Sequence, residues 1–287
     1  MCNSGGSGIN TFSLNQTNGL LPSATALQTF QYTLAAPGPV QARQDAPHPH
    51  HAILDPTKQF ILVPDLGADL IRTYSLDGPN SRIIESTPVK VEAGAGPRHG
   101  VFAPSGEKYY QLNELSNEVH VFSVKYTTVN HTPTMQFTSV QNISTYPAGT
   151  TPAFSPLPTA AEIIISPDGR YLYTSNRSDK TFSSAAVGPA PNTQTVISDS
   201  ITAFKISPGS GHLKLMEQTP VAGLIPRHFS METTDGGRYV AVATQTTGRV
   251  AVYERDVHSG RLATVPVASI DVGAIGGAEP NCVIWLD

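Results

Sequence analysis

The 287-residue chain has few cysteines, few charges and no long apolar run. Two cysteines, Cys2 and Cys282, cannot build a disulfide framework and lack zinc-motif spacing. The formal net charge is −4, and the absence of a lysine and arginine cluster argues against a nucleic-acid surface. No stretch approaches the roughly 20 apolar residues that span a bilayer, so we expect no membrane partner.

The N-terminal residues also lack the basic and apolar regions of a signal peptide, so we expect a cytoplasmic protein. Glycosylation sequons weakly favour the alternative, a secreted protein with a longer native N-terminus. The four sequons lie at Asn15, Asn130, Asn142 and Asn176.

Turn-forming residues are abundant instead. Glycine and proline each occur 24 times, while charged residues make up 14% of the chain and hydrophobic residues 39%. This composition predicts many short strands joined by tight turns. No apolar stripe of helical period extends beyond two turns, which argues against helical bundles and parallel βαβ folds.

Four segments share one pattern of apolar run, turn, second apolar run and alternating third strand. They are residues 51–76, 99–124, 162–180 and 228–255. Turns such as Pro167-Asp168-Gly169 supply the positive φ that a hairpin needs. Four-stranded units repeating every roughly 45–65 residues predict an all-β propeller, with blades at 46–95, 96–150, 160–222 and 223–275. In the third blade a loop at 181–199 precedes the third strand at 201–204.

The two ends of the chain predict a fifth, composite blade. Residues 281–286 resemble a first strand, whereas residues 9–14 and 26–32 resemble outer strands. Pairing them would combine residues 1–45 with 279–287, close the ring and remove open sheet edges. The prediction is one propeller domain over residues 1–287, with about five blades.

Propeller geometry also predicts where a site lies. The residue before each first strand and the residue after each second strand meet at the channel mouth, and these positions are polar while the strands are apolar. Convergent titratable groups on one concave face indicate a functional site, although they can also face water or join neighbouring blades. The positions are His50, Asp65, Arg98, Glu114, Glu162, Asn176, Arg177, Arg227, His228, Gln245 and Asn281.

Other motifs are weaker. His48, His50 and His51 form a histidine-rich tract, but strand alternation predicts that His50 and His51 point to different sides, so we expect no metal. No Gly-x-Ser-x-Gly elbow is present, which argues against a serine hydrolase triad. Asp69 and Asp179 follow second strands, and we expect them to cap turns.

Several segments closely resemble the propeller lactonase family, which includes bacterial-type 6-phosphogluconolactonases and the fungal 3-carboxy-cis,cis-muconate lactonizing enzyme. They are residues 96–100 (GPRHG), 109–114 (YYQLNE), 162–169 (EIIISPDG), 171–177 (YLYTSNR) and 226–229 (PRHF). Residues 43–50 and 63–72 resemble the fungal branch in particular. The resemblance runs from about residue 8 to the end, and its members have seven blades, so about two N-terminal blades are missing here.

The resemblance implies a catalytic set of one histidine, two arginines and one glutamate. These are His50, Arg98, Glu114 and Arg177, which are also among the positions that propeller geometry selects. It implies a small lactone or anionic substrate held by arginines, with His50 as acid/base and no cofactor. Asp65, Glu162, Asn176, Arg227, His228, Gln245 and Asn281 are expected to bind substrate.

Three functions stay open. The first is hydrolysis of a sugar-acid lactone such as 6-phosphogluconolactone. The second is a cofactor-free cyclase or isomerase acting on a muconate-type or secondary-metabolite substrate. The third is an inactive propeller that serves as a binding scaffold. An imperfectly closed ring would expose sheet edges that favour self-association.

Overall fold

The computed structural model describes residues 1–3, 5–77, 82–130, 132–150, 158–185, 195–273 and 277–286. These residues form β-strands and no α-helix, which confirms the all-β prediction. None of them forms a helix long and apolar enough to cross a membrane. The chain divides into two compact units: the first contains 1–116 with 123–138, and the second 117–122 with 139–287.

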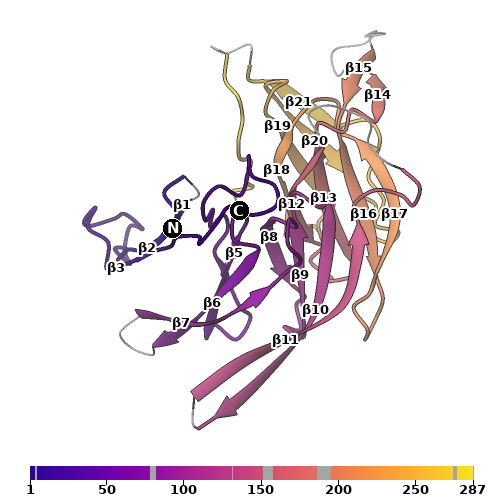
Figure 1. The fold of residues 1–287 in the computed structure, drawn as a ribbon. Helices are drawn as coiled ribbons and strands as arrows, with labels where there is room; N and C mark the ends of the chain where they lie inside the picture. Colours follow the sequence, from indigo (N-terminus) through magenta and orange to yellow (C-terminus); the bar gives the residue numbers. More distant parts are fainter. Residues whose placement is uncertain are drawn as a thin grey trace. The chain divides into compact units, whose positions relative to one another are not determined.

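Each of the four predicted blades corresponds to one four-stranded sheet (Figure 1). The strands of each sheet pair in chain order, as in a propeller blade, although in the third sheet a separate hairpin lies between the second and third strands. The first sheet has β4 (Ile53–Leu54), β5 (Phe60–Asp65), β6 (Leu70–Asp77) and β7 (Arg82–Lys90). The second has β8 (Pro97–Phe102), β9 (Lys108–Asn113), β10 (Glu118–Val129) and β11 (Thr132–Ser144). The third has β12 (Thr159–Ile165), β13 (Tyr171–Arg177), β16 (Ser200–Ile206) and β17 (Leu213–Pro220). The fourth has β18 (Pro226–Met231), β19 (Tyr239–Thr244), β20 (Arg249–Glu254) and β21 (Ala268–Asp271).

The hairpin turns form for the reasons that their residues suggest. Asp55 uses one carboxylate oxygen to accept the backbone N–H groups of Gln59 (2.9 Å) and Phe60 (2.7 Å) between β4 and β5. Between β12 and β13, Gly169 has φ 68°, a conformation that glycine adopts without strain. These local hydrogen bonds and the glycine fix the pairing register of each inner hairpin.

Each unit has its own apolar core. In the second unit, Tyr173, Phe229 and Tyr253 pack together from three different strands, and all are almost fully buried. In the first unit, Val63 and Tyr74 of the first sheet pack with Ile9 of the N-terminal segment. The N-terminal strands therefore cover the first sheet.

The predicted composite blade is not present in the described residues. The N-terminal strands β1 (Cys2–Asn3), β2 (Gly8–Thr11) and β3 (Gln28–Gln31) form a three-stranded sheet among themselves. Residues 281–286 form no strand. Instead, the indole of Trp285 donates to the carbonyl of Ser230 (3.2 Å) on β18. The prediction that residues 281–286 form a strand is therefore wrong. This apolar segment contacts the fourth sheet through the side chain of Trp285 instead of pairing as a strand.

The prediction of a plain loop at residues 181–199 is also wrong in part. Its two ends form a separate hairpin from β14 (Phe182–Ala185) and β15 (Thr195–Ser198), and residues 186–194 lie outside the described residues. Only part of this segment has the β-branched and aromatic residues that are typical of strands. The serine- and alanine-rich remainder gave no indication that its two ends pair. The third strand predicted at 201–204 lies within β16.

A glycine on β8 makes a stability prediction possible. A Cβ atom at Gly100 would lie 2.1 Å from the Tyr109 hydroxyl, and Tyr109 is fully buried with that hydroxyl bonded to Gln111 (2.8 Å). Because the ring cannot move away, we expect Gly100→Ala to lower the free energy of unfolding by about 1–3 kcal/mol. Urea unfolding measures the change. Gly209→Ala is the contrast: that glycine has φ 75° but no atom near its Cβ, so only backbone strain is added.

Candidate functional site

A β-bulge marks the start of three of the four inner strands. The pairing register shifts between Pro97 and His99 in β8, between Ala160 and Ile163 in β12, and between Pro226 and His228 in β18. A bulge frees one residue from the hydrogen-bond ladder and re-aims its side chain. The freed positions contain Arg98, Glu162 and Arg227, all of which the sequence predicts as site residues.

In the first unit, a buried glutamate joins two arginines. Glu114 follows β9 and is 1% exposed, and its carboxylate lies 2.9 Å from Nε of Arg98, which is 2% exposed. The other carboxylate oxygen pairs with Arg43, whose side chain is 45% exposed. One carboxylate thus holds a buried guanidinium and a half-exposed one. The cluster combines two predicted residues with Arg43, which the prediction did not include.

The same unit contains a cluster of imidazoles. Nδ1 of His50 lies 3.0 Å from Nε2 of His99, so one ring donates a hydrogen bond to the other. The ring of His51 stacks on the ring of His99, with 4.5 Å between the two ring centroids. The prediction that His50 and His51 point to different sides is therefore wrong: both rings contact His99. The reason is that residues 50 and 51 precede β4 and do not alternate as a strand does.

Asp65 has a structural environment. It ends β5, is fully buried, and accepts the backbone N–H groups of His48 (2.7 Å) and Ala68 (3.2 Å). Its second oxygen lies 2.8 Å from two guanidinium nitrogens of Arg72. Four donors occupy this carboxylate, so its role is to fix the end of β5, and we leave it out of the proposed site.

In the second unit, Glu162 and His228 approach each other. Their nearest side-chain atoms, Oε2 and Nε2, lie 3.6 Å apart, and the glutamate is 6% exposed against 26% for the histidine. The other ring nitrogen of His228 accepts the N–H of Val283 (3.3 Å). A carboxylate and an imidazole from two neighbouring inner strands thus form a second polar pair.

Arg177 and Asn176 end β13 and are held in different ways. Arg177 donates to the carbonyls of Thr159 (3.3 Å) and Ala160 (3.1 Å) at the start of β12, and it remains 8% exposed. Asn176 is fully buried and donates to the hydroxyl of Thr202 (3.0 Å). This burial keeps the Asn176 sequon out of reach of glycosylation in the folded protein.

The remaining predicted residues lie near the ends of the fourth sheet. Arg227 is half-buried, and its side chain makes no hydrogen bond or ion pair within the described ranges. Gln245 donates to Glu279 (3.1 Å), and Asn281 is exposed. Of this group, Arg227 is best able to bind an added anion, because its guanidinium has no protein partner in that part of the chain.

Two residues of the candidate site were missed at the sequence level. His99 lies beside Arg98 in the GPRHG segment, but it is neither the residue before a predicted first strand nor the residue after a second strand. Arg43 lies far from any strand, in a turn where its backbone N–H bonds to Val40 (2.8 Å). Strand alternation does not predict where a turn residue points, so the only signal for Arg43 in the sequence is its positive charge a few residues before His50.

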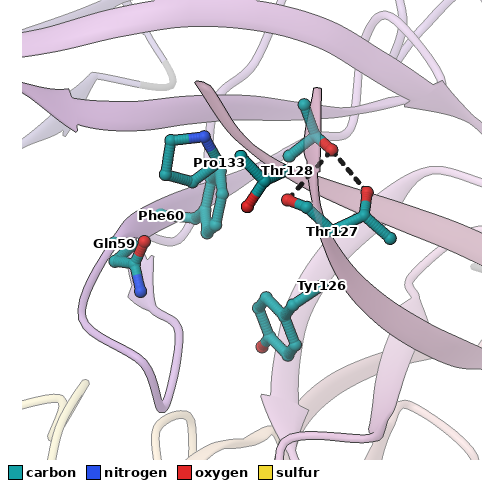
Figure 2. Close-up of a pocket in the computed structure, with 7 residues that line it drawn as sticks. Gln59, Phe60, Tyr126, Thr127, Thr128 and Pro133 are labelled. Carbon is teal, nitrogen blue, oxygen red and sulfur yellow. Dashed lines mark hydrogen bonds between the residues drawn. The ribbon is translucent and has the colours of Figure 1, made fainter. Parts of the chain in front are cut away.

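A separate cavity of about 170 Å³ lies between the start of β5 and the β10–β11 hairpin (Figure 2). Phe60 and Tyr126 line its wall, with 6.2 Å between their ring centroids. The hydroxyls of Thr127 and Thr134 form a hydrogen bond of 2.7 Å. Burial, followed by the nearby Asp55, raises the pKa of the Tyr126 hydroxyl. The described residues that line this cavity include no acid or base that titrates near neutral pH, which argues against it as a catalytic centre.

Comparison with known proteins agrees with these features. The family description "Lactonase, 7-bladed beta-propeller" matches residues 2–285. The chain is 35% identical over 264 residues to an Arthroderma benhamiae protein named "Probable 6-phosphogluconolactonase", covering 91% of this chain and 59% of that protein. It is 31% identical to a 6-phosphogluconolactonase of Bacillus subtilis, covering 85% of this chain and again 59% of the relative.

A solved structure, the periplasmic gluconolactonase PpgL of Pseudomonas aeruginosa, matches with a TM-score of 0.71 and 26% identity. The match covers 95% of this chain and 68% of that one. The chain thus spans about three fifths of the length of the curated relatives. Because the family match extends over nearly every residue and the four sheets repeat the blade pattern, the chain belongs to the lactonase family of seven-bladed β-propellers.

Proposed function

We propose that the chain opens a sugar-acid lactone, such as 6-phosphogluconolactone, by hydrolysis. The observation that carries this proposal is the cluster of the first unit, in which buried Glu114 holds Arg43 and Arg98 while His99, the residue after Arg98, bonds to His50. Such a cluster combines anion binding with an acid/base group. The relatives named 6-phosphogluconolactonase support this substrate class.

Each group has a defined part in the proposed reaction. His50 takes a proton from water, and the resulting hydroxide adds to the lactone carbonyl carbon. Arg98 stabilises the negative charge on the carbonyl oxygen. Arg177, in the second unit, is proposed separately as an anion-binding residue. The bond from that carbon to the ring oxygen then breaks, and His50 returns the proton to the departing ring oxygen. Glu114 fixes the guanidinium of Arg98, and no step needs a cofactor.

The contact with His99 determines what His50 can do. If His50 Nδ1 donates to His99, the Nε2 atom of His50 lacks a proton and is a base; if Nδ1 accepts, Nε2 carries a proton and is an acid. Once Nε2 of His50 has taken a proton from water, the Nδ1 proton of His50 can pass to Nε2 of His99, and its return restores the first arrangement when Nε2 of His50 gives its proton up. This exchange suits a reaction in which one group first removes a proton and later returns it.

Substrate contacts are proposed for Glu162, Asn176, Arg227, His228, Gln245 and Asn281 in the second unit. Among these, Arg227 is the best candidate for a phosphate or carboxylate, because guanidinium binds both through paired hydrogen bonds. Asn176 is the weakest, because its amide already donates to Thr202 and Ser200.

Proton release by the purified 287-residue chain tests the proposal. We expect turnover of 6-phosphogluconolactone and of unphosphorylated glucono-δ-lactone above the spontaneous rate. His50→Gln removes the acid/base group and should lower kcat by about 10²–10⁴-fold. Arg98→Lys keeps the charge but loses the fixed fork of donors, so it should lower kcat/KM more than Arg43→Lys does.

Two controls make the result decisive. Far-UV circular dichroism and thermal unfolding of each variant show that the fold is kept. Gln141→Ala serves as a control variant, since the side chain of Gln141 hydrogen-bonds to the backbone of Leu213 and Gln141 is not a candidate site residue. A folded, monodisperse wild-type chain without turnover on either lactone would contradict the hydrolase proposal and favour a cyclase or a binding scaffold.

A further inference from the structure

The residue immediately before the third strand of a sheet reaches the segment that leads into the next inner strand. In the first sheet this residue is Asp69, which precedes β6. Its two carboxylate oxygens accept the backbone N–H groups of Gly94 (2.7 Å) and Gly96 (2.8 Å). Gly96 lies two residues before Arg98. We call such a contact an inter-sheet clip.

The third sheet contains a clip at the equivalent position. Asp199 precedes β16 and is fully buried, and one of its oxygens accepts the N–H groups of Ser178 (2.9 Å) and Ile225 (2.7 Å). The other accepts the N–H of Lys180 (2.9 Å). Ile225 lies two residues before Arg227, as Gly96 does before Arg98.

The second sheet has an amide in place of the carboxylate. Asn117 precedes β10, and its side chain donates to the carbonyl of Pro158 (2.9 Å), next to the start of β12. Gly248 occupies the position before β20 in the fourth sheet, with φ 69° and no side chain to form a clip. Three consecutive sheets therefore carry at this position a side chain that hydrogen-bonds to the backbone ahead of the next inner strand, as an acceptor at Asp69 and Asp199 and as a donor at Asn117.

The residues that Asp199 binds have strained backbone conformations, which its hydrogen bonds help to stabilise. Ser178, Lys180 and Ile225 have φ of 61°, 46° and 60°, the left-handed region in which a β-branched residue is an outlier. All three donate their N–H groups to Asp199. Gly96, the counterpart of Ile225, has φ 65° and adopts it without strain.

Proline links each clip to its arginine. Pro97 and Pro226 lie between the clipped residue and the bulged arginine, and a proline ring fixes φ near −65°. The orientation of the clipped peptide therefore passes to the next residue with little freedom. From this geometry we infer that Asp69 and Asp199 are positioning residues for Arg98 and Arg227 respectively, an inference that rests on these arginines binding the substrate in the proposed function.

Isosteric substitution tests each clip separately. In Asp69→Asn and Asp199→Asn, one accepting oxygen becomes an NH₂ group that faces a backbone N–H. We expect the amides of Gly94 and Gly96 in the first variant, and of Ser178, Lys180 and Ile225 in the second, to exchange hydrogen about tenfold faster. The Arg98 Nε–H resonance, which reports the pair with Glu114, should shift in Asp69→Asn and stay unchanged in Asp199→Asn.

Anion binding provides the functional measurement. With inorganic phosphate and 6-phosphogluconate as probes, we expect Kd to rise about tenfold in each variant, and KM to rise more than kcat falls. Asp256→Asn is the matched control, because Asp256 also accepts two backbone N–H groups, from His258 and Ser259, but in an exposed turn. It should leave both constants unchanged.

The outcomes separate this inference from the proposed function. Faster amide exchange with an unchanged Arg98 resonance, and with Kd equal to that of Asp256→Asn, would overturn the positioning role. A wild-type chain without turnover or phosphate binding would defeat the proposed function, while the Arg98 resonance still decides the clip at Asp69. If Asp199→Asn does not fold, adding Ile225→Gly removes the strain, and the same Kd comparison applies.

Discussion

Replacing Glu114 with alanine is expected to lower the free energy of unfolding by about 3–5 kcal/mol, because the buried Arg98 guanidinium then loses its carboxylate. Arg98 is 2% exposed and cannot turn to water without moving the start of β8. A buried charge without its partner costs far more than the pair itself contributes. Equilibrium unfolding in urea measures this change.

Arg43→Ala is the matched control for this prediction. Arg43 pairs with the same carboxylate but is 45% exposed, so water screens the interaction, and its loss should cost less than about 1 kcal/mol. Equal losses in the two variants would contradict the burial argument. Activity separates the roles further: Glu114→Gln, which keeps the shape of the side chain, should impair substrate binding through Arg98 even where the fold survives.

Asp179→Asn is expected to make the protein more stable at pH 8 and to leave it nearly unchanged at pH 4. Burial, together with the charge and hydrogen bond of neighbouring Asp199, raises the pKa of Asp179 to about 7, although a hydrogen bond from Ser200 acts in the opposite direction. Tyr146 also lies near this pair, and burial, followed by the charges of Asp179 and Asp199, raises the pKa of its hydroxyl.

The sign of the effect follows from proton binding. Between about pH 4 and 7 the native protein keeps the proton on Asp179, while the unfolded chain, with a pKa near 3.8, has lost it. Stability from this group is therefore fully present below pH 4, falls as the pH rises to 7, and is level above that. A pKa difference of about three units corresponds to a loss on the order of 4 kcal/mol. Asparagine resembles the protonated acid and avoids this loss.

Urea unfolding of both proteins from pH 4 to pH 8 measures the difference. Asp168→Asn provides a control of opposite sign. Although burial acts to raise the pKa of Asp168, hydrogen bonds from Ser166 and Arg170 lower it, so this substitution should destabilise above pH 4. An Asp179→Asn variant whose advantage over wild type is the same at pH 5 and pH 8 would refute the assignment.

Most of the fold could be predicted from the sequence repeat, because turn residues and alternating apolar residues report local structure. The four sheets correspond to the four predicted blades, and the turn at Asp55 is bonded as its sequence suggested. The composite blade failed because strand pairing is not local. Residues 281–286 have a strand pattern, yet Trp285 contacts β18 instead. No periodicity distinguishes these two uses of an alternating apolar segment.

The structure brings predicted residues together where position in the repeat determines which side chains meet. Arg98 and Glu114 were selected from different strands, and the structure joins them in one ion pair. Asp65 occupied an equivalent position, but its carboxylate is filled by Arg72 and backbone donors. The ion pair of Arg43 with Glu114 and the contact of His50 with His99 depend on the conformation of irregular segments, which strand alternation does not predict. The assignment of catalytic roles remains a prediction.

The bulges at the starts of β8, β12 and β18 have a consequence for how specificity can change. Arg98, Glu162 and Arg227 stand outside the pairing register, so their replacement leaves the cross-strand ladder intact. Arg98 and Glu162 are buried beside Glu114 and His228, so replacing either also removes a charge partner. Arg227 is half-buried, and its guanidinium has no partner within the described residues, so this position can change charge without a compensating change on the adjacent strand. A library that randomises the Arg227 codon should therefore yield more folded variants with altered anion binding than a library that randomises the Arg98 codon.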